Sequence, residues 1–532
     1  MSTDTAPPAT PAPTTPGQGR PLGRGRAALL GMVAVLLTVA VAELLAALAG
    51  WAGLLSSSAS PVGSLGGAFI DVSPGSLVEW AKQNLGAPGD KVALGIGMGL
   101  TLLLAGALIG LVARVRLTIG LTLAVLLAVV AAVAIESRAD AGVFELLPLA
   151  IGAFAGCRYL WTALRPRYST GTGVRTADRR QFLMFAGYGA LGAAIAGALS
   201  RMIPSGAATA ESRAAVTLPT AEMQSETGVQ TLNSVPGISS YVTPNADFYR
   251  IDTAFVLPQV PTAGWKLRIH GMVDKEIEID FAALAARPML ERMITLTCVS
   301  NPRGGDLVGN ARWIGTRIAD LLAEAGPQAG ADCVLSADVK GFTVSTPLEA
   351  LTDDRDSLLA IGMNGEPLPV EHGFPVRMVV PGLYGYVSAT KWVVDMEVTR
   401  FDKVMAYWTG LGWSDHGPIK TSSRIDVPGD TAAAGQVPVA GVAWAQHRGI
   451  SGVQVQINAG DGWSAWADAE LSRPVSTDTW VQWVYRWDAK PGDYKIHCRA
   501  IDLDGKPQIG EDSDVIPDGA TGYHQISVTV TA

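Results

Sequence analysis

Five long apolar runs in the first 200 residues constrain this fold more than any other feature. They cover residues 27–54, 92–113, 117–135, 146–164 and 182–200. Each is close to the roughly 20 residues that a helix needs to cross the hydrocarbon core of a bilayer. Backbone groups in hydrocarbon find no water to bond, so we expect each run to be helical. The sequence therefore predicts a five-helix transmembrane domain over 27–200 and a multi-pass protein of the plasma membrane.

The distribution of basic residues between these runs predicts the orientation. One side of the membrane would collect Arg20, Arg24, Arg26, Arg114, Arg116, Arg165, Arg167, Arg175, Arg179 and Arg180. The other side would collect Lys82, Lys91 and Arg138. Because cytoplasmic loops carry the excess of Lys and Arg, the N-terminus is predicted to be cytoplasmic. After five crossings the rest of the chain would then lie outside the cytoplasm. Residues 1–26 are rich in Pro, Thr and Gly and are expected to be a disordered tail.

The start of the fifth run offers a second signal. Arg179 and Arg180 are followed by Gln, Phe, Leu and a Gly/Ala-rich apolar stretch. This pattern resembles a twin-arginine export signal, whose pathway carries proteins that are already folded. The alternative is that both arginines are ordinary cytoplasmic anchors of a membrane helix.

The remaining 330 or so residues have the pattern of a soluble module with two parts. Residues 201–240 are rich in Ala, Ser, Thr and Gly and are expected to be a linker. Over 241–422, short β-rich runs alternate with helical stretches such as 279–286 and 317–325, which predicts a mixed α+β domain. Over 423–532, short strands recur between turns rich in Gly, Pro and Asp, which predicts an all-β sandwich.

Charge and composition exclude several function classes. The formal net charge is −8 and the pI is near 5.4, which argues against nucleic acid as a partner. All histidines lie at or after His270, and no CxxCH motif occurs, so neither a membrane-embedded bis-histidine haem in the first half nor a c-type haem is expected. Electrons would therefore leave to a separate carrier. The cysteines are too few and too scattered for a disulfide framework or a CxxC metal site. They are Cys157, Cys298, Cys333 and Cys498.

Three segments of the second half carry the chemistry. They are YVTPNADFYR at 241–250, LTCVSNPR at 296–303 and MNGEPLPVEHGFPVRMVVPGLYG at 363–385. Together they resemble the sulfite oxidase family of molybdopterin-dependent oxidoreductases, over about residues 240–422. The strands that follow resemble the immunoglobulin-like dimerisation domain of that family, which leaves a homodimer open. The resemblance implies a molybdenum-molybdopterin cofactor.

Cys298 ends an apolar, strand-like run and precedes a turn-prone stretch, so a ligand could reach its thiol at the end of the strand. A thiolate is a soft donor that suits a soft or redox-active metal. The alternative is a buried structural cysteine, the usual fate of a single Cys. The resemblance implies that Cys298 binds molybdenum, and we expect the other three cysteines to be structural.

Arg250 and Arg303 are the candidates for holding an anionic substrate. Guanidinium groups are permanently charged and fork onto oxyanions, although either arginine could instead form a surface salt bridge. The resemblance implies that both are catalytic residues that line the substrate pocket. Two departures bear on them. The family often has Arg where this chain has Pro302, and commonly has Asn-His where this chain has Ile251 and Asp252. The acidic Asp252 bears on both cofactor contact and anion preference.

The cofactor contacts follow from discrete cationic side chains rather than from a phosphate-binding loop. The resemblance implies that His372, Arg377 and Lys391 hold the pterin and its phosphate. For His372 the alternative is a core histidine at a turn. The further cofactor contacts that the resemblance suggests are Asn245, Tyr249, Arg250, Cys298, Ser388 and Thr390.

Trp413 falls where sulfite oxidases place a pocket tyrosine, so we count it among the candidate catalytic residues. An indole cannot accept a proton or offer a phenolic hydroxyl, which bears on whether sulfite is the substrate. The alternative is that Trp413 only packs.

The resemblance as a whole implies a membrane-anchored, extracytoplasmic enzyme that transfers an oxygen atom on a small oxyanion or sulfur compound. Sulfite oxidation is the first expectation, and reduction of a methionine sulfoxide-type substrate is the second. The rival from another class is a cofactor-free membrane receptor or scaffold.

Overall fold

The computed structural model describes residues 23–85, 89–165, 179–203, 206–224 and 228–532. The chain divides into two compact units. The first contains Met1–Ala68 and Lys91–Ser205, and the second contains Phe69–Asp90 and Gly206–Ala532. The predicted tail over 1–26 lies almost wholly outside the described residues.

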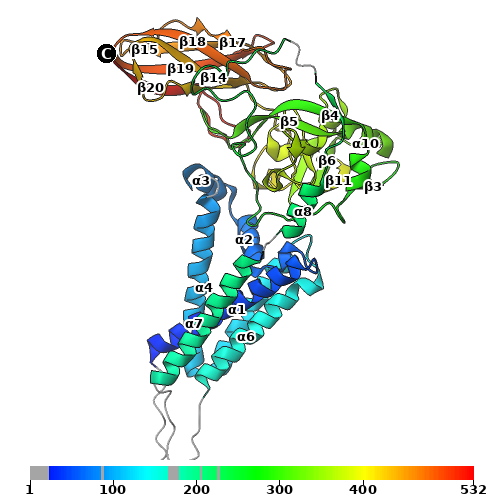
Figure 1. Cartoon of the computed structure of the whole chain (residues 1–532), viewed down its shortest axis with the longest axis vertical. Coiled ribbons are helices and arrows are strands. Elements are labelled where there is room, and N and C mark those ends of the chain that lie inside the picture. Colours follow the sequence, from blue (N-terminus) through cyan, green and yellow to red (C-terminus); the bar gives the residue numbers. More distant parts are fainter. Residues whose placement is uncertain (1–22, 86–88, 166–178, 204–205, 225–227) are drawn as a thin grey trace, which may run out of the picture. The chain divides into compact units, whose positions relative to one another are not determined.

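Long helices build the first unit (Figure 1). They are α1 (Arg24–Trp51), α4 (Gly89–Val115), α5 (Leu117–Glu136), α6 (Leu147–Leu164) and α7 (Arg179–Met202). Two shorter helices, α2 (Pro61–Val72) and α3 (Gly75–Leu85), come between α1 and α4 in the sequence. Among the described residues, five helices are long and apolar enough to cross a membrane, and they coincide with the five apolar runs.

Small residues let these helices approach closely. A Cβ added at Gly110 of α4 would overlap the carbonyl oxygen of Ala27 in α1. A Cβ at Gly152 of α6 would likewise overlap the carbonyl oxygen of Thr38. Apolar helices gain little from hiding apolar surface in lipid, so close backbone packing of this kind is what holds such bundles together.

The second unit begins with two sheets. The first has the order β1-β4-β5-β8-β10, with β9 paired to β8. Its strands are β1 (Ala221–Met223), β4 (Met289–Thr297), β5 (Val308–Arg317), β8 (Leu358–Met363), β9 (Glu366–Pro367) and β10 (Arg377–Val379). The second has the order β3-β2-β11-β6-β7. Its strands are β2 (Lys266–Gly271), β3 (Ile277–Asp280), β6 (Cys333–Asp338), β7 (Thr343–Pro347) and β11 (Val393–Thr399).

Short helices follow three of these strands. In α10 (Ile318–Ala325), the residues spaced for one helical face are all buried, and Gly326 ends the helix with a positive φ. The helix expected over 279–286 begins later than predicted. Asp280 still belongs to β3, and its side chain accepts the N–H of Ala283, so α9 spans only Phe281–Ala285. The third helix, α11, spans Leu348–Thr352.

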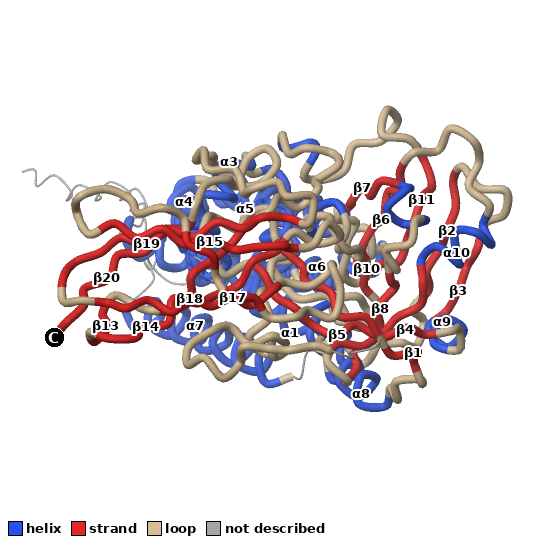
Figure 2. Tube along the Cα trace, turned by 90° about the horizontal axis from the view of Figure 1, so that it is seen from above, coloured by secondary structure: helices blue, strands red, loops and turns tan. Residues whose placement is uncertain are grey.

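Two further sheets complete the unit (Figure 2). The first has the order β12-β14-β18-β17, with strands β12 (Ser422–Val427), β14 (Gly435–Trp444), β17 (Glu470–Leu471) and β18 (Val481–Ala489). The second has the order β13-β20-β19-β15-β16, with strands β13 (Thr431–Ala433), β15 (Ile450–Asn458), β16 (Ala467–Asp468), β19 (Gly492–Asp502) and β20 (His524–Thr531). Both sheets contribute to one apolar core, which contains Val439, Trp483, Val453 and Ile496. Burial alternates along β19 and β20, as expected for sheets with one solvated face.

The expected linker over 201–240 is partly folded. It contains helix α8 (Ala207–Ala215) and strand β1, which pairs in parallel with β4. Arg213 of α8 donates hydrogen bonds to the carbonyl oxygens of Pro367 and Leu368. Composition did not indicate this, because the residues that order the segment are distant in the sequence.

Candidate active site

A pocket beside the end of β4 brings together six residues that the sequence singled out. Its lining includes Tyr249, Cys298, His372, Arg377, Lys391 and Trp413. They come from the loop before β2, the end of β4, the segment around β10 and the loop after β11. These six residues supply one thiol, two cations, one imidazole and two aromatic side chains.

Cys298 directly follows β4 and is 8% exposed. Its N–H donates to the carbonyl of Leu307, and its own carbonyl accepts the N–H of Asn301. The Asn301 side chain in turn accepts the N–H of Leu307 at 2.9 Å. These bonds close a tight turn after the strand, and the thiol is held at the wall of the pocket.

His372 ends a short 3₁₀ turn, Val370–His372, and is buried. Its Nε2 lies 3.0 Å from the carbonyl oxygen of Asn245, and since a carbonyl only accepts, Nε2 carries the proton. Burial lowers the pKa of His372 to about 4, so the ring is neutral at physiological pH. Asn245 thus lies behind His372, outside the pocket lining, and its side-chain amide donates to Glu366.

Arg377 begins β10 and is almost fully buried. Its Nη1 donates to the carbonyl oxygen of His372 at 3.1 Å, and its guanidinium lies 4.9 Å from the centre of the Trp313 ring. Burial lowers the pKa of Arg377 to about 10, which still leaves it charged at neutral pH. The pocket wall therefore contains a fixed positive charge.

Lys391 provides the second positive charge. Its Nζ donates to Oδ2 of Asp252 at 2.9 Å and to the carbonyl oxygen of Glu371 at 3.1 Å. Burial lowers the pKa of Lys391 to about 8, and the nearby Asp252 opposes this shift. Nε of Arg250 donates to the same Oδ2 of Asp252 at 2.9 Å. Asp252 lines the pocket, whereas Arg250 is not part of the described lining and contacts Asp252.

Aromatic side chains form much of the remaining wall. Burial raises the pKa of Tyr249, so its phenol stays protonated. Trp413 is 4% exposed, and its ring lies 5.7 Å from that of Tyr386 and 6.2 Å from that of Trp408. The indole N–H of Trp413 is buried and has no hydrogen-bond partner among the described residues. It is a donor held in place at the pocket wall.

Three predicted residues lie elsewhere. Arg303 forms an ion pair with Asp512, 40% of its side chain is exposed, and it is absent from the described pocket lining. Ser388 donates to backbone carbonyls, and Thr390 is hydrogen-bonded to Ser336 at 2.7 Å. Both are fully buried behind the wall. The expectation that Arg303 lines the pocket therefore does not match its position, because a carboxylate from a distant segment holds it away.

The lining residues that were not predicted include Asp338, Phe342, Tyr386 and Trp408. Asp338 accepts the N–H groups of Lys340 and Phe342 and so fixes the turn that presents Phe342 to the pocket. The aromatic-rich stretch at 407–413 could have indicated that Trp408 lines the pocket together with Trp413. Nothing in the local sequence around Asp338 gave such an indication.

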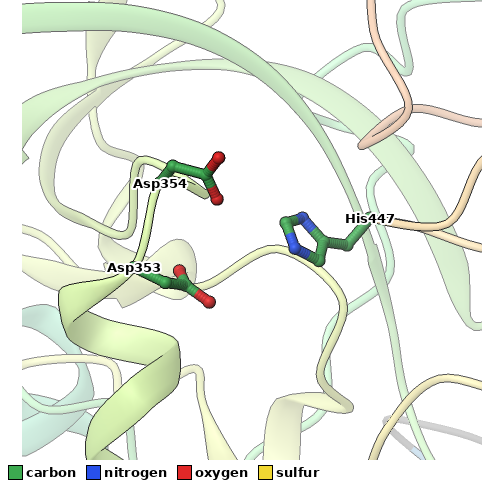
Figure 3. Close-up of side chains that lie close together, drawn as sticks. All are labelled: Asp353, Asp354 and His447. Carbon is green, nitrogen blue, oxygen red and sulfur yellow. The ribbon is translucent and has the colours of Figure 1, made fainter.

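A separate group of metal-binding residue types lies on an exposed surface. The carboxylates of Asp353 and Asp354 and the imidazole of His447 lie close together (Figure 3). Arg355 already forms an ion pair with Asp353, and Nδ1 of His447 lies 3.6 Å from a carboxylate oxygen of Asp478. We assign no metal site to these three residues, because exposed acidic groups commonly lie together without an ion.

The pocket fits a cofactor that carries both a soft metal and an anionic group. Cys298 could supply a thiolate to the metal. Arg377 and Lys391 could hold a phosphate, and the protonated Nε2 of His372 fixes the orientation of its ring. The unpartnered N–H of Trp413 is a further donor for a bound oxygen atom.

Residues 254–408 match the oxidoreductase molybdopterin binding domain. An uncharacterised oxidoreductase of Bacillus subtilis, YuiH, is 34% identical over 161 residues, which is 30% of this chain and 78% of that protein. The chain belongs to the sulfite oxidase family of molybdopterin oxidoreductases. It is accordingly a molybdopterin-dependent oxidoreductase with molybdenum-molybdopterin as its cofactor, which confirms those two expectations.

Further members of the sulfite oxidase family match over a longer stretch. Human mitochondrial sulfite oxidase is 28% identical over 313 residues, which is 49% of this chain and 56% of that protein. The chain thus spans about half the length of the curated sulfite oxidases it matches. Among solved structures, the sulfane dehydrogenase SoxCD of Paracoccus pantotrophus is 21% identical with a TM-score of 0.48, over 55% of this chain and 82% of that one.

Proposed function

We propose that this protein is a membrane-anchored, extracytoplasmic enzyme that transfers an oxygen atom on a small sulfur compound, with sulfite oxidation as the first candidate reaction. The observation that carries this proposal is the pocket that joins Cys298 to His372, Arg377 and Lys391. When bound, the cofactor supplies two-electron oxygen-atom chemistry, and the protein supplies orientation and charge.

The residue roles follow from the geometry. Cys298 is the proposed molybdenum ligand, because its thiol lies at the wall of the pocket. Arg377 and Lys391 are the proposed ligands of the pterin phosphate. His372 is a neutral hydrogen-bonding contact, oriented by the carbonyl oxygen of Asn245. Tyr249 and Trp413 contribute to the pocket walls next to these groups.

The proposed architecture has four parts after the N-terminal tail. A transmembrane domain over 27–200 is supported by the five apolar helices and by the distribution of arginines. A short linker leads to the molybdopterin domain over 241–422, and an immunoglobulin-like sandwich of the dimerisation type spans 423–532. Two sheets that share one apolar core support the sandwich assignment. A separate electron carrier would accept or supply electrons.

A second candidate reaction is reduction of a sulfoxide. The aromatic wall around Trp413 favours it, because an apolar pocket with one unpartnered N–H suits an uncharged molecule that has a single acceptor oxygen. Such a reduction would use two electrons and two protons, break the S=O bond and release water. The two electrons would come from two molecules of a reduced one-electron carrier.

The decisive experiment begins with the metal and pterin content of protein purified from a host that makes the cofactor. Near-stoichiometric molybdenum and pterin are expected, and their absence would overturn the enzyme assignment in favour of a receptor or scaffold. The molybdenum signal of the oxidised protein should then change with sulfite, or that of the reduced protein with methionine sulfoxide. If neither compound changes the signal, both candidate reactions are wrong.

A further inference from the structure

Asp252 is a buried carboxylate of the pocket to which the proposed function assigns no role. Its side chain is 4% exposed, and one carboxylate oxygen accepts from both Nζ of Lys391 and Nε of Arg250, each at 2.9 Å. A buried carboxylate shared by two cations neutralises charge that an anionic ligand would otherwise meet. The residue therefore bears on which ligands the pocket accepts.

The charges of the described lining balance. The cations are Arg377 and Lys391, and the carboxylates are Asp252 and Asp338. Arg250, which is not part of the lining, adds one further positive charge next to Asp252. His372 adds no charge near neutral pH, because burial keeps the ring unprotonated. A bound pterin phosphate would add about two further negative charges, as a phosphate monoester does near pH 7. A compact dianion would then meet no net attraction.

Both arginines expected to hold an anionic substrate are already paired. Arg250 is held by Asp252, and Arg303 is held by Asp512 outside the pocket lining. Trp413, which also lines the pocket, has a buried indole N–H without a hydrogen-bond partner among the described residues. The pocket therefore presents aromatic surface and neutral polar groups where a sulfite-binding site would need unpaired guanidinium groups.

We propose that Asp252 is a specificity-determining residue, which makes the pocket discriminate against dianions and admit substrates with little or no charge. This inference rests on the proposed oxygen-atom-transfer function. Within that function it favours the second candidate, reduction of an uncharged sulfoxide with one acceptor oxygen, over oxidation of the sulfite anion. Asp252 acts through the two cations that it neutralises and touches no reacting atom.

The test compares the wild type with Asp252→Asn in the cofactor-loaded full chain. The probes are inhibitors of graded charge: sulfate as dianion, formate as monoanion and dimethyl sulfone as a neutral molecule. Removing one buried negative charge should tighten sulfate inhibition at least about tenfold and formate inhibition less, and should leave dimethyl sulfone within about twofold. An equal change for all three probes, or no change for sulfate, would overturn the proposal.

Asp512→Asn is the matched control. It removes the partner of Arg303 in the same way, but at a place outside the described pocket lining. Its inhibition by sulfate should stay within about twofold of the wild type. If sulfate inhibition tightened equally in both variants, the effect would be one of general surface charge and the proposal would be wrong.

Two measurements keep the test independent of turnover. Sulfate should raise the melting temperature of cofactor-loaded Asp252→Asn protein more than that of the cofactor-loaded wild type, because a ligand that binds only the folded state stabilises it. This comparison tests the role of Asp252 even if neither candidate substrate is converted. In that case the proposed function would be wrong, whereas the inference about Asp252 would still be tested. If the variant does not fold, the cofactor-loaded wild type decides, because sulfate binding to it tighter than about 1 mM would contradict the proposal.

Discussion

At the scale of single residues, burial and partners decide what each predicted side chain can do. Arg250 and Arg303 are the same residue type in two of the predicted motifs, yet one lies next to the pocket and the other is paired with Asp512. Cys298 and Cys333 are both buried thiols, but only Cys298 lines the pocket that the structure describes. The sequence identified the candidate residues, whereas their neighbours in the folded chain determine which of them lie at the pocket.

Replacing Cys298 with serine should abolish turnover while leaving the fold intact. Groups that merely support a metal ligand cost about 10–100-fold in affinity or activity when removed, so loss of the ligand itself should exceed about 100-fold. Activity, molybdenum content and the melting temperature would be measured together. Cys333→Ala is the control, expected to cost about 1 kcal/mol of stability and to retain activity. Wild-type turnover in the serine variant would refute the ligand assignment.

The buried His372 should make stability depend on pH. Its pKa is about 4 in the folded protein and about 6.5 in the unfolded chain. Between these values the unfolded state binds more protons, so the free energy of unfolding falls as the pH drops from 6.5 towards 4. The contribution should approach about 3 kcal/mol at the acid end.

Thermal unfolding of the full chain in detergent between pH 7 and 4.5 would measure this effect. His372→Gln should show a shallower fall than the wild type. Part of the fall should persist, because burial also lowers the pKa of His524 to about 4. Identical profiles for His372→Gln and the wild type would contradict the burial argument.

At the scale of elements, the distance between paired strands decides whether a glycine can be replaced by a residue with a side chain. Gly441 lies in β14 where the backbone of β12 crosses closely, and an added Cβ would overlap the carbonyl oxygen of Arg424. Gly452 in β15 has room, with its nearest neighbour 3.6 Å from an added Cβ. Both glycines occur in strands of the same sandwich, so the pair isolates close packing from the general cost of changing a glycine.

Gly441→Ala should therefore destabilise the sandwich by about 3 kcal/mol, since two backbones would have to separate. Gly452→Ala should change the free energy of unfolding by less than about 1 kcal/mol. Denaturant unfolding, monitored by the fluorescence of the buried tryptophans, would compare the two variants. Equal stability of the two variants would show that β12 and β14 do not approach as closely as described.

At the scale of the whole molecule, the second unit is one folded body built from two β-rich parts. The side-chain amide of Gln446 donates to the carbonyl of Thr295, and the Thr295 hydroxyl accepts the N–H of Trp480. Thr295 belongs to β4, which leads directly to Cys298. The strand that presents the thiol is thus braced by residues of the C-terminal sheets, so we expect the molybdopterin domain to depend on the sandwich for its stability.

The orientation of the chain in the membrane is the prediction at this scale. A reporter enzyme fused after Ala532 should be active only outside the cytoplasm, because five crossings follow a cytoplasmic N-terminus. The same reporter inserted after Arg116 should report a position inside the cytoplasm, which serves as the control. Changing Arg179 and Arg180 to lysine should reduce the exported activity if the pair acts as an export signal, and should leave it unchanged if the arginines are plain anchors. Internal activity of the C-terminal fusion would refute the topology.

The sequence by itself determined the properties that depend on local pattern. Apolar runs of membrane-spanning length predicted the five helices, β-rich runs between turn residues predicted the strand-rich regions, and the motifs around Cys298 and His372 indicated the family. Such features follow from residues that are near one another in the chain, where hydrophobicity and turn chemistry act directly.

The tertiary structure alone decided which charges meet. The pairing of Asp252 with Lys391 and of Arg303 with Asp512, the strand β1 within the expected linker, and the unpartnered N–H of Trp413 all depend on segments that are remote in sequence. Electrostatic and hydrogen-bond energies depend on distance and burial, which no local pattern encodes. For that reason the sequence could name the cofactor, whereas the charge balance that selects a substrate emerged only from the folded chain.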